Sequence, residues 1–221
     1  MGPAESYEVL VFDWDGTLVD STGLIARAIL LAAQDLGVDV PDRSQAWHVI
    51  GLGLAPALAR VVPGLARERI PEFAARYQVH FRAAEQTIGL FEGAREALDA
   101  LHSRGVRMAI ATGKTRAGLE RSLERAGLGG HFEALRCADQ THPKPHPAML
   151  LELAVEMGVA PARLLMIGDT SHDLQMAASA GAGGVGVAFG AHPRAELERL
   201  RPLHVFDTPA ELHRWLLEHF S

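Results

Sequence analysis

The sequence predicts an α/β fold: a Rossmann-like parallel sheet with helices on both faces, plus an inserted α-helical cap domain. From residue 88 onward, short and nearly continuous apolar runs alternate with helix-like segments, as expected for parallel strands buried on both faces. An earlier apolar run, residues 8–12 (EVLVF), is followed only by helical sequence and therefore needs the later strands to pair with. We therefore expect a core domain of residues 1–19 and 88–221 and a cap domain of residues 20–87.

The cap begins with a helix expected over residues 21–37, where apolar residues recur at helical spacing. Ser21 or Asp20 is expected to cap the start of this helix, and a glycine ends it. Residues 55–62 and 68–86 are rich in alanine and arginine and predict further helices, separated by prolines and glycine.

The rest of the core is expected to alternate helices and strands. In chain order these are helix 93–104, strand 106–111, helix 115–126, strand 133–137, helix 147–157, strand 164–167, helix 171–180 and strand 184–188, with residues 203–206 and 209–219 completing the series. In sheets of this kind ligands bind beyond the carboxyl ends of the strands, so the residues that follow each strand are the candidates for a binding site.

The composition limits the class of function. With 221 residues, 48% hydrophobic and 22% charged, the chain is long and apolar enough for a substantial globular core. A net charge of −6 argues against nucleic acid and anionic membranes as partners. One cysteine, Cys137, excludes a disulfide scaffold and favours a reducing compartment, and with no membrane span or leader in the sequence we expect a cytoplasmic protein.

Polar residues follow three of the expected strands. Asp13 and Asp15 follow the first, Thr112 to Lys114 follow strand 106–111, and Asp169 and Asp173 follow strand 164–167. Four carboxylates at one edge of a sheet would repel one another strongly unless a hard divalent cation lay among them. Mg²⁺ prefers such oxygens and often bridges to a substrate phosphate, so the pattern predicts a magnesium site and a phosphoryl substrate.

The neighbouring groups suit phosphate recognition. Thr112 offers a hydroxyl, and Gly113 lets backbone N–H groups approach a ligand closely. Lys144 supplies a positive charge on a loop stiffened by prolines on both sides. Asp13 is the expected nucleophile, because carboxylates form aspartyl-phosphates, and Asp15 could protonate the leaving oxygen and later activate water.

Four segments in this order resemble the motifs of the haloacid dehalogenase superfamily: residues 12–21 (FDWDGTLVDS), 111–113 (ATG), 144–145 (KP) and 168–173 (GDTSHD). The resemblance covers essentially the whole chain. Because helical sequence follows the first motif, the chain is most similar to the phosphoglycolate phosphatase-like branch, which has a helical cap. A hydrolase acting as a phosphatase on a small phosphorylated metabolite is therefore implied.

The resemblance also implies roles for single residues. Asp13 would form the phospho-enzyme and Asp15 would be the general acid and base. The phosphoryl group would be held by Thr112, Lys144 and the N–H groups of Trp14 and Gly113, and Mg²⁺ by Asp13, the backbone carbonyl of Asp15 and Asp169, with Asp173 in support. Trp14 stands where leucine is more usual and is expected to pack in the core; Lys114 is expected to face solvent.

Alternatives remain. A dehalogenase would attack carbon and would not need the second aspartate, so Asp15 favours phosphorus. A phosphosugar mutase of the β-phosphoglucomutase kind differs mainly in how its cap shields the phospho-enzyme, and the sequence does not separate it from a phosphatase. A non-catalytic binding protein would be expected to have lost a motif residue. Zinc binding by His142, His146 and His172 is disfavoured, and these side chains are expected to face solvent or substrate.

Substrate choice is expected to lie with the cap. The residues expected near the cleft are Arg43, His48 and the turn 51–53, which contains Gly51. An arginine could bind a carboxylate bidentately, which makes phosphoglycolate the leading candidate, ahead of sugar phosphates, nucleotides and pyrophosphate. The sequence does not distinguish a monomer from a homodimer.

Overall fold

A computed structural model describes residues 7–39 and 42–220, without the side chain of Arg43. In this part of the chain the core is a six-stranded parallel sheet with the strand order β3-β2-β1-β4-β5-β6. The strands are β1 (Val9–Phe12), β2 (Arg107–Thr112), β3 (Ala134–Cys137), β4 (Leu164–Gly168), β5 (Gly183–Val187) and β6 (His204–Phe206). The predicted fold class is confirmed.

Six α-helices of the described core cover this sheet: α6 (Ala94–Ser103), α7 (Arg116–Ala126), α8 (Ala148–Met157), α9 (Ser171–Ala180), α10 (Arg194–Glu198) and α11 (Pro209–His219). A 3₁₀ turn, η3 (Pro161–Arg163), precedes β4. Local signals fix several ends, for example the glycines in left-handed conformation after α7 and α8. The short helix α10 was not predicted, because five residues are too few to show a helical period.

The residues of β1 alternate between two cores. Leu10 and Phe12 pack with side chains of α6, α7 and α11, whereas the other two residues of the strand pack with α8 and α9 on the opposite face. Phe12 pairs with Ile110 of β2 and with Ile167 of β4, so the ends of these three strands lie within two residues of one another along the sheet. The side chains that follow them are therefore brought to one edge of the sheet.

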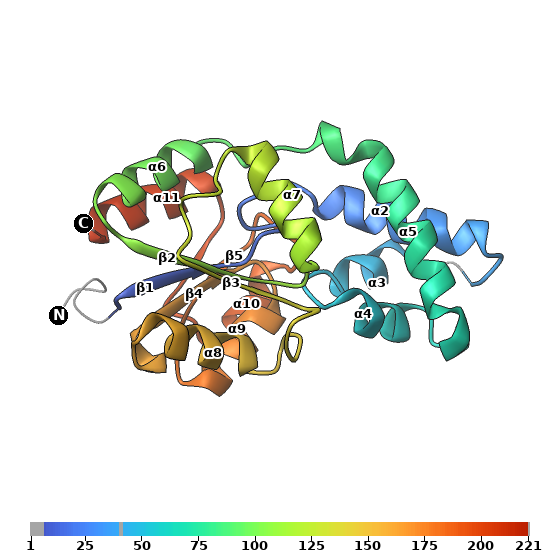
Figure 1. Cartoon of the computed structure of the whole chain (residues 1–221). Coiled ribbons are helices and arrows are strands. Elements are labelled where there is room, and N and C mark those ends of the chain that lie inside the picture. Colours follow the sequence, from blue (N-terminus) through green and yellow to red (C-terminus); the bar gives the residue numbers. More distant parts are fainter. Residues whose placement is uncertain (1–6, 40–41, 221) are drawn as a thin grey trace.

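A second group of helices lies beyond this edge: α2 (Thr22–Asp35), α3 (Arg43–His48), α4 (Leu54–Val61), η1 (Arg67–Arg69), α5 (Ile70–Ala84) and η2 (Glu85–Thr87). Figure 1 shows them at the carboxyl ends of the strands, opposite the two chain termini. They enclose their own apolar cluster, which includes Ile29, Leu58 and Phe73. We call this helical segment the cap; its division from the core at residues 20–87 stays a prediction.

Two adjacent stretches of chain connect the cap to the core. Asp20 donates its backbone N–H to the Gly89 carbonyl (3.0 Å), and Phe91 donates to the Leu18 carbonyl (3.0 Å).

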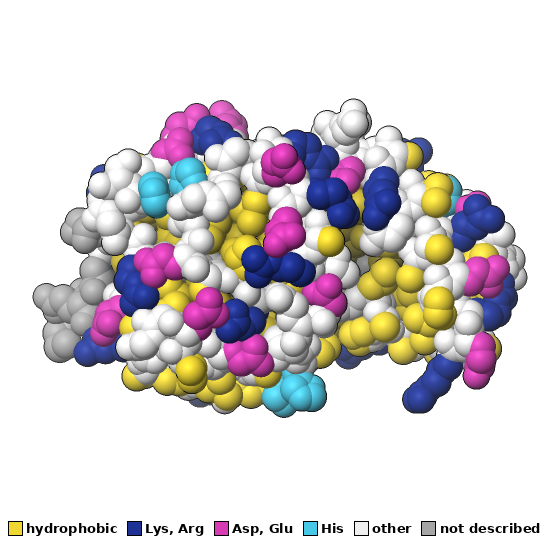
Figure 2. Space-filling model, in the orientation of Figure 1, with side chains coloured by type: hydrophobic (Ala, Val, Ile, Leu, Met, Phe, Trp, Pro, Cys, Tyr) yellow, Lys and Arg dark blue, Asp and Glu magenta, His cyan; other side chains and the backbone are white. Residues whose placement is uncertain are grey.

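Among the described residues, no helix is both long and apolar enough to cross a membrane. Figure 2 shows acidic and basic side chains interspersed over the core on the face in view, without a continuous basic stripe there.

Candidate active site

Asp13 occupies the first position after the central strand. Its backbone N–H donates to the Ile167 carbonyl (2.9 Å), which fixes it level with the end of β4. The carboxylate is completely buried, and Oδ1 lies 2.8 Å from Lys144 Nζ. Oδ2 makes no hydrogen bond with any described residue. A buried carboxylate oxygen without a partner is costly, so this atom indicates where a cation would bind.

Three buried carboxylates meet at this point. Asp13, Asp169 and Asp173 each present an oxygen within 4.8 Å of the others. Burial raises the pKa of Asp13 to about 7; Lys144 opposes the shift and Asp173 adds to it. Burial also raises the pKa of Asp169, with repulsion from Asp13 and Asp173 contributing. The Lys144 ammonium lies 2.8 Å from Asp13 and 2.6 Å from Asp173, and one lysine leaves two negative charges uncompensated when all three carboxylates are ionised.

The three carboxylates have different partners. Asp173 Oδ2 accepts hydrogen bonds from the backbone N–H and the hydroxyl of Thr170 (3.1 and 2.6 Å), in the capping box that starts α9, while Oδ1 faces Lys144. Asp169 accepts from the Ala191 N–H (2.7 Å) and the Thr17 hydroxyl (3.2 Å). Asp173 therefore positions Lys144 and the helix, and Asp13 has the open oxygen. An all-oxygen donor set with uncompensated negative charge fits Mg²⁺.

Two glycines make room for Asp169. Gly16 has a positive φ of 82°, and a Cβ there would lie 2.1 Å from Asp169 Oδ2. A Cβ on Gly190 would lie 2.4 Å from the same oxygen and 2.4 Å from the Gly16 carbonyl oxygen. Gly190 was missed in the sequence, although its place shortly after the fifth strand was a usable signal.

Asp15 points away from the buried carboxylates and has its own partners. Its Oδ1 accepts a hydrogen bond from the Ser21 hydroxyl (2.7 Å), and Lys114 Nζ lies 3.1 Å from both carboxylate oxygens. The expectation that Lys114 faces solvent is wrong. Its side chain is 11% exposed, because α5 of the cap covers it and places the Phe81 ring 4.9 Å from Nζ. Ser21 is the residue before α2, but its side chain makes no capping hydrogen bond.

The second motif lies directly against the cap. Thr112 is buried at the end of β2, and its hydroxyl accepts a hydrogen bond from the Lys114 N–H (3.2 Å). A Cβ on Gly113 would lie 2.7 Å from the carbonyl oxygens of both Gly51 and Leu52, so the cap turn 51–53 rests on this glycine. Trp14 is buried as expected, and its indole N–H donates to the Ser122 hydroxyl (2.8 Å).

A cavity of about 310 Å³, which we call the cleft, lies between the core and the cap. Asp13, Asp15, Thr112, Gly113 and Lys114 line it on the core side. Most of the cap residues that line it are apolar or aromatic and include Ile25, Ile29, Leu52, Leu54, Tyr77 and Phe81. Among the described residues, the one arginine in this lining is Arg121 of α7.

The structure divides the predicted cap residues. Gly51 lines the cleft, whereas the Arg43 side chain lies outside the described residues. The placement of His48 at the cleft is wrong: its side chain is 46% exposed and lies beside Glu196 in a separate pocket. α3 ends at His48, and the chain then turns: the residues from 50 to 57 line the cleft, His48 lines the separate pocket, and Val49 lines both.

The histidines expected to face solvent or substrate also divide. His142 and His146 are exposed, as expected. His172 is 4% exposed and its Nε2 lies 3.2 Å from the His48 carbonyl oxygen, so for this residue the expectation is wrong. Burial, followed by the neighbouring His192, lowers the pKa of His172 to about 4. The residues around His172 in the sequence do not indicate that the cap covers this part of α9.

A family model of haloacid dehalogenase-like hydrolases matches residues 10–187 of this chain. The chain belongs to this family. A protein of Dickeya dadantii named "Probable phosphatase IndB" is 37% identical over 209 residues, which cover 92% of this chain and 91% of that protein. The phosphoglycolate phosphatase of Colwellia psychrerythraea is 31% identical over 217 residues, covering 93% and 95%.

A solved structure agrees with this assignment. The crystal structure of a hydrolase from Pseudomonas syringae superimposes with a TM-score of 0.87 at 25% identity, covering 97% of this chain and 100% of the other. The predicted family and the predicted enzyme class, a phosphoric monoester hydrolase, are confirmed. Of the motif residues, Asp13, Asp15, Thr112 and Gly113 line the cleft, whereas Lys144, Asp169 and Asp173 lie in the buried group that includes Asp13.

Proposed function

We propose that this hydrolase is a Mg²⁺-dependent phosphatase that cleaves a small phosphorylated metabolite through an aspartyl-phosphate on Asp13. The observation that carries the proposal is the buried group of Asp13, Asp169 and Asp173, whose charge Lys144 compensates only in part. The open Asp13 Oδ2 belongs to a residue that lines the cleft, which an attack on a substrate there requires.

Asp13, Asp169 and the backbone carbonyl of Asp15 would hold the metal, with Asp173 in support through its contact with Lys144. When bound, Mg²⁺ supplies positive charge that neutralises the carboxylates and the phosphoryl oxygens. Lys144, Thr112 and the N–H groups of Trp14 and Gly113 would orient the phosphoryl group toward Asp13.

In the first half of the reaction, a carboxylate oxygen of Asp13 forms a bond to phosphorus while the ester P–O bond breaks. The electron pair of that bond goes to the leaving oxygen, which Asp15 protonates. In the second half, Asp15 accepts a proton from water as the water oxygen bonds to phosphorus; the bond between phosphorus and the Asp13 oxygen breaks, its electron pair returns to the carboxylate, and inorganic phosphate leaves. Ser21 and Lys114 hold the Asp15 carboxylate in place for both transfers.

Phosphoglycolate is the leading candidate substrate, supported by the similarity to phosphoglycolate phosphatases. Arg121 lines the cleft and also supports this substrate, because its guanidinium could bind the substrate carboxylate, the role first considered for Arg43. A phosphomonoester with an apolar or aromatic leaving group is the second candidate. The wall that the cap adds to the cleft favours this class, because Tyr77, Phe81 and the aliphatic residues beside them suit an apolar ligand.

The test is a panel of phosphomonoesters assayed for phosphate release with Mg²⁺ present and ranked by kcat/KM. The panel includes phosphoglycolate, aryl and alkyl phosphates, nucleoside 5′-monophosphates and β-glucose 1-phosphate. We expect release of inorganic phosphate from at least one class and loss of that activity on chelation with EDTA. Isomerisation of the sugar phosphate without phosphate release would support a mutase instead, and activity that survives chelation would contradict the magnesium site.

A further inference from the structure

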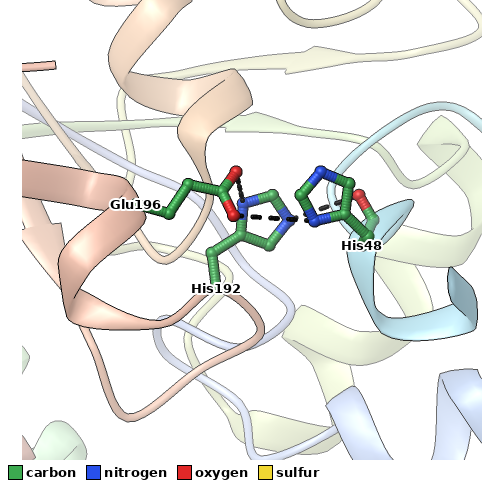
Figure 3. Close-up of side chains that lie close together, drawn as sticks. All are labelled: His48, His192 and Glu196. Carbon is green, nitrogen blue, oxygen red and sulfur yellow. Dashed lines mark hydrogen bonds and ion pairs between the residues drawn. The ribbon is translucent and has the colours of Figure 1, made fainter. Parts of the chain in front are cut away.

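A second cluster of metal-ligand side chains lies outside the cleft, where the cap meets the core. His48 stands at the end of α3 in the cap, whereas in the core His192 stands just before α10 and Glu196 lies within that helix. Figure 3 shows the Glu196 carboxylate beside the His192 ring, with the His48 ring lying next to it. We propose that these three side chains form a binding site for a transition-metal ion of the Zn²⁺ type, separate from the aspartate site.

The hydrogen bonds of His192 show which ring nitrogen carries the lone pair that a metal could use. Its Nδ1 lies 3.0 Å from the Ser171 backbone nitrogen, whose N–H donates to it, so Nδ1 carries a lone pair. Its Nε2 lies 3.3 Å from the His48 carbonyl oxygen and donates its proton there. A histidine that binds a metal through one nitrogen and donates the other N–H to a carbonyl is the usual arrangement, and an ion would replace the Ser171 N–H at Nδ1.

The distances fit one small ion. Glu196 Oε1 lies 3.1 Å from His192 Nδ1, and Glu196 Oε2 lies 3.6 Å from His48 Nδ1. Two ligands of a tetrahedral zinc ion, each about 2.0–2.1 Å from the metal, are about 3.4 Å apart, so the two measured separations bracket this value. These two separations involve different Glu196 oxygens; with one ligand atom taken from each residue, the three atoms lie within 4.8 Å of one another. Because the His48 ring lies parallel to that of His192, it would have to rotate out of this stack to point its Nδ1 at a shared ion, and its side chain is 46% exposed.

The donor set selects the class of metal. Two imidazole nitrogens and one carboxylate are borderline ligands that suit Zn²⁺, Co²⁺ and Ni²⁺, whereas Mg²⁺ prefers oxygen ligands alone. The rings of His48 and His192 are stacked, with centroids 4.6 Å apart and planes inclined by 3°. His192 is buried, so packing fixes its ring, whereas the side chains of Glu196 and His48 are 24% and 46% exposed and can adjust. Zn²⁺ and Mg²⁺ would therefore be sorted between the two sites by donor chemistry.

An ion at this site would tie the cap to the core. A pocket lined by Ser44, Trp47, Arg60 and Glu196 reaches His48 from the surface, so the site is open to solvent. The segment that carries His192 is also bonded to Asp169, since the N–H groups of Ala191 and His192 donate to that residue (2.7 and 3.1 Å). Occupancy would consequently fix α3 against the segment that supports the proposed magnesium site.

The experiment measures binding of Zn²⁺ and of Co²⁺ to the full chain in saturating Mg²⁺, so that the aspartate site is occupied. Zn²⁺ is titrated in competition with a chromophoric chelator, and Co²⁺ is followed by its visible d–d absorption. We expect one equivalent of either ion to bind, and Zn²⁺ to raise the Tm because the ion binds only the folded protein. His48→Ala and Glu196→Gln should each weaken binding by more than about 100-fold, beyond the loss typical of an outer-shell change.

The matched control is His142→Ala/His146→Ala, which removes a different pair of histidines whose ring centroids are 4.5 Å apart. This variant should bind Zn²⁺ as the wild type does. His48→Ala and Glu196→Gln lie outside the cleft and should keep phosphate release in Mg²⁺ alone, which also shows that they are folded. The proposal is overturned if Mg²⁺ displaces the ion, if only the control variant loses it, or if the wild type binds no Zn²⁺ at micromolar concentration.

Discussion

The two walls of the cleft differ in chemistry. The core wall carries Asp13 and Asp15, which follow β1, and Thr112 and Lys114, which lie at and just after the end of the adjacent parallel strand β2. The cap wall is built from side chains such as Ile29, Tyr77 and Phe81, which project from separate helices. In the proposed function the core wall would bind and transfer the phosphoryl group, whereas the cap wall offers mainly shape and apolar surface.

Because of this difference, we expect the core wall to govern the rate of phosphoryl transfer and the cap wall to govern the choice of substrate. A fault in the core wall should lower turnover of every substrate, because the phosphoryl group is common to all of them. A fault in the cap wall should change the ratio between substrates, because only the leaving group reaches it. The two lysines of the chain lie at different places relative to these walls. Lys144 lies in the buried aspartate group, whereas Lys114 lies where the core wall meets the cap wall.

The largest effect is expected for Asp13→Asn. Removal of the nucleophile should lower kcat by about 10⁴-fold or more for every substrate and prevent phospho-enzyme formation, while the Tm stays near that of the wild type. Asp139→Asn is the matched control, because Asp139 also lines the cleft but accepts the Arg116 N–H instead of joining the buried group. Substantial Mg²⁺-dependent turnover in Asp13→Asn would contradict the assignment of the nucleophile.

A smaller loss is expected for Lys114→Met. Without its ammonium, Asp15 keeps only the Ser21 hydroxyl, and we expect kcat to fall by about 100-fold with a changed pH profile, at the low end of general acid–base contributions. Arg121→Met is the control for charge in the cleft and should alter KM more than kcat. Equal effects of the two substitutions on KM alone would show that Lys114 acts on substrate binding and not on Asp15.

The apparent affinity for Mg²⁺ should depend on pH. Burial raises the pKa of Asp13 to about 7, and burial raises the pKa of Asp169 as well. As pH falls below about 7, a proton occupies the Asp13 carboxylate and competes with the metal, so Mg²⁺ affinity should fall by up to about tenfold per pH unit for that proton.

The stability of the metal-free protein should change in the opposite sense. Because the folded pKa of Asp13 lies above its unfolded value, the folded state binds the proton more tightly, and stability is lost as pH rises through about 7. The rise in Tm that Mg²⁺ produces should therefore be larger at pH 8 than at pH 5.5. A rise in Tm that does not change with pH would contradict the raised pKa of the site.

The smallest effect is expected in the cap wall. Phe81→Leu removes an aromatic ring from the cleft, where Phe81 stacks on Tyr77 with centroids 5.8 Å apart. We expect the ratio of kcat/KM for an aryl phosphate over phosphoglycolate to fall about tenfold, with kcat for phosphoglycolate little changed. Val79→Ala on the same helix is the control, since Val79 is 58% exposed. Equal losses for both substrates would show that the cap wall does not select between them.

Much of the core wall could be predicted, because the sequence patterns that indicate its residues lie within short segments of the chain. Each strand was visible as an apolar run, and the polar residues that end it had to lie at one edge of a parallel sheet. Asp13, Thr112 and Asp169 were placed in this way, and the structure brings all three to that edge. Their roles in the reaction stay predictions until the substitutions above are measured.

The remaining contacts could not be predicted, because they depend on how distant segments pack. Lys114 was expected to face solvent, since nothing near it in the chain shows that Phe81 would cover it. Ser21 was expected to cap a helix, but the bend after β1 brings its hydroxyl to Asp15. Residues 48 and 192 are 144 positions apart, and only the docking of α3 beside α10 brings His48 to His192.

The sequence by itself therefore determined the sheet, the carboxylates at its carboxyl edge and the family, because strand periodicity and motif order are properties of short segments. The tertiary structure decided which of those carboxylates lacks a partner, what covers Lys114, and which cap residues reach the cleft. These outcomes depend on burial and on the approach of side chains from separate elements, and a pattern along one segment carries no information about its distant neighbours.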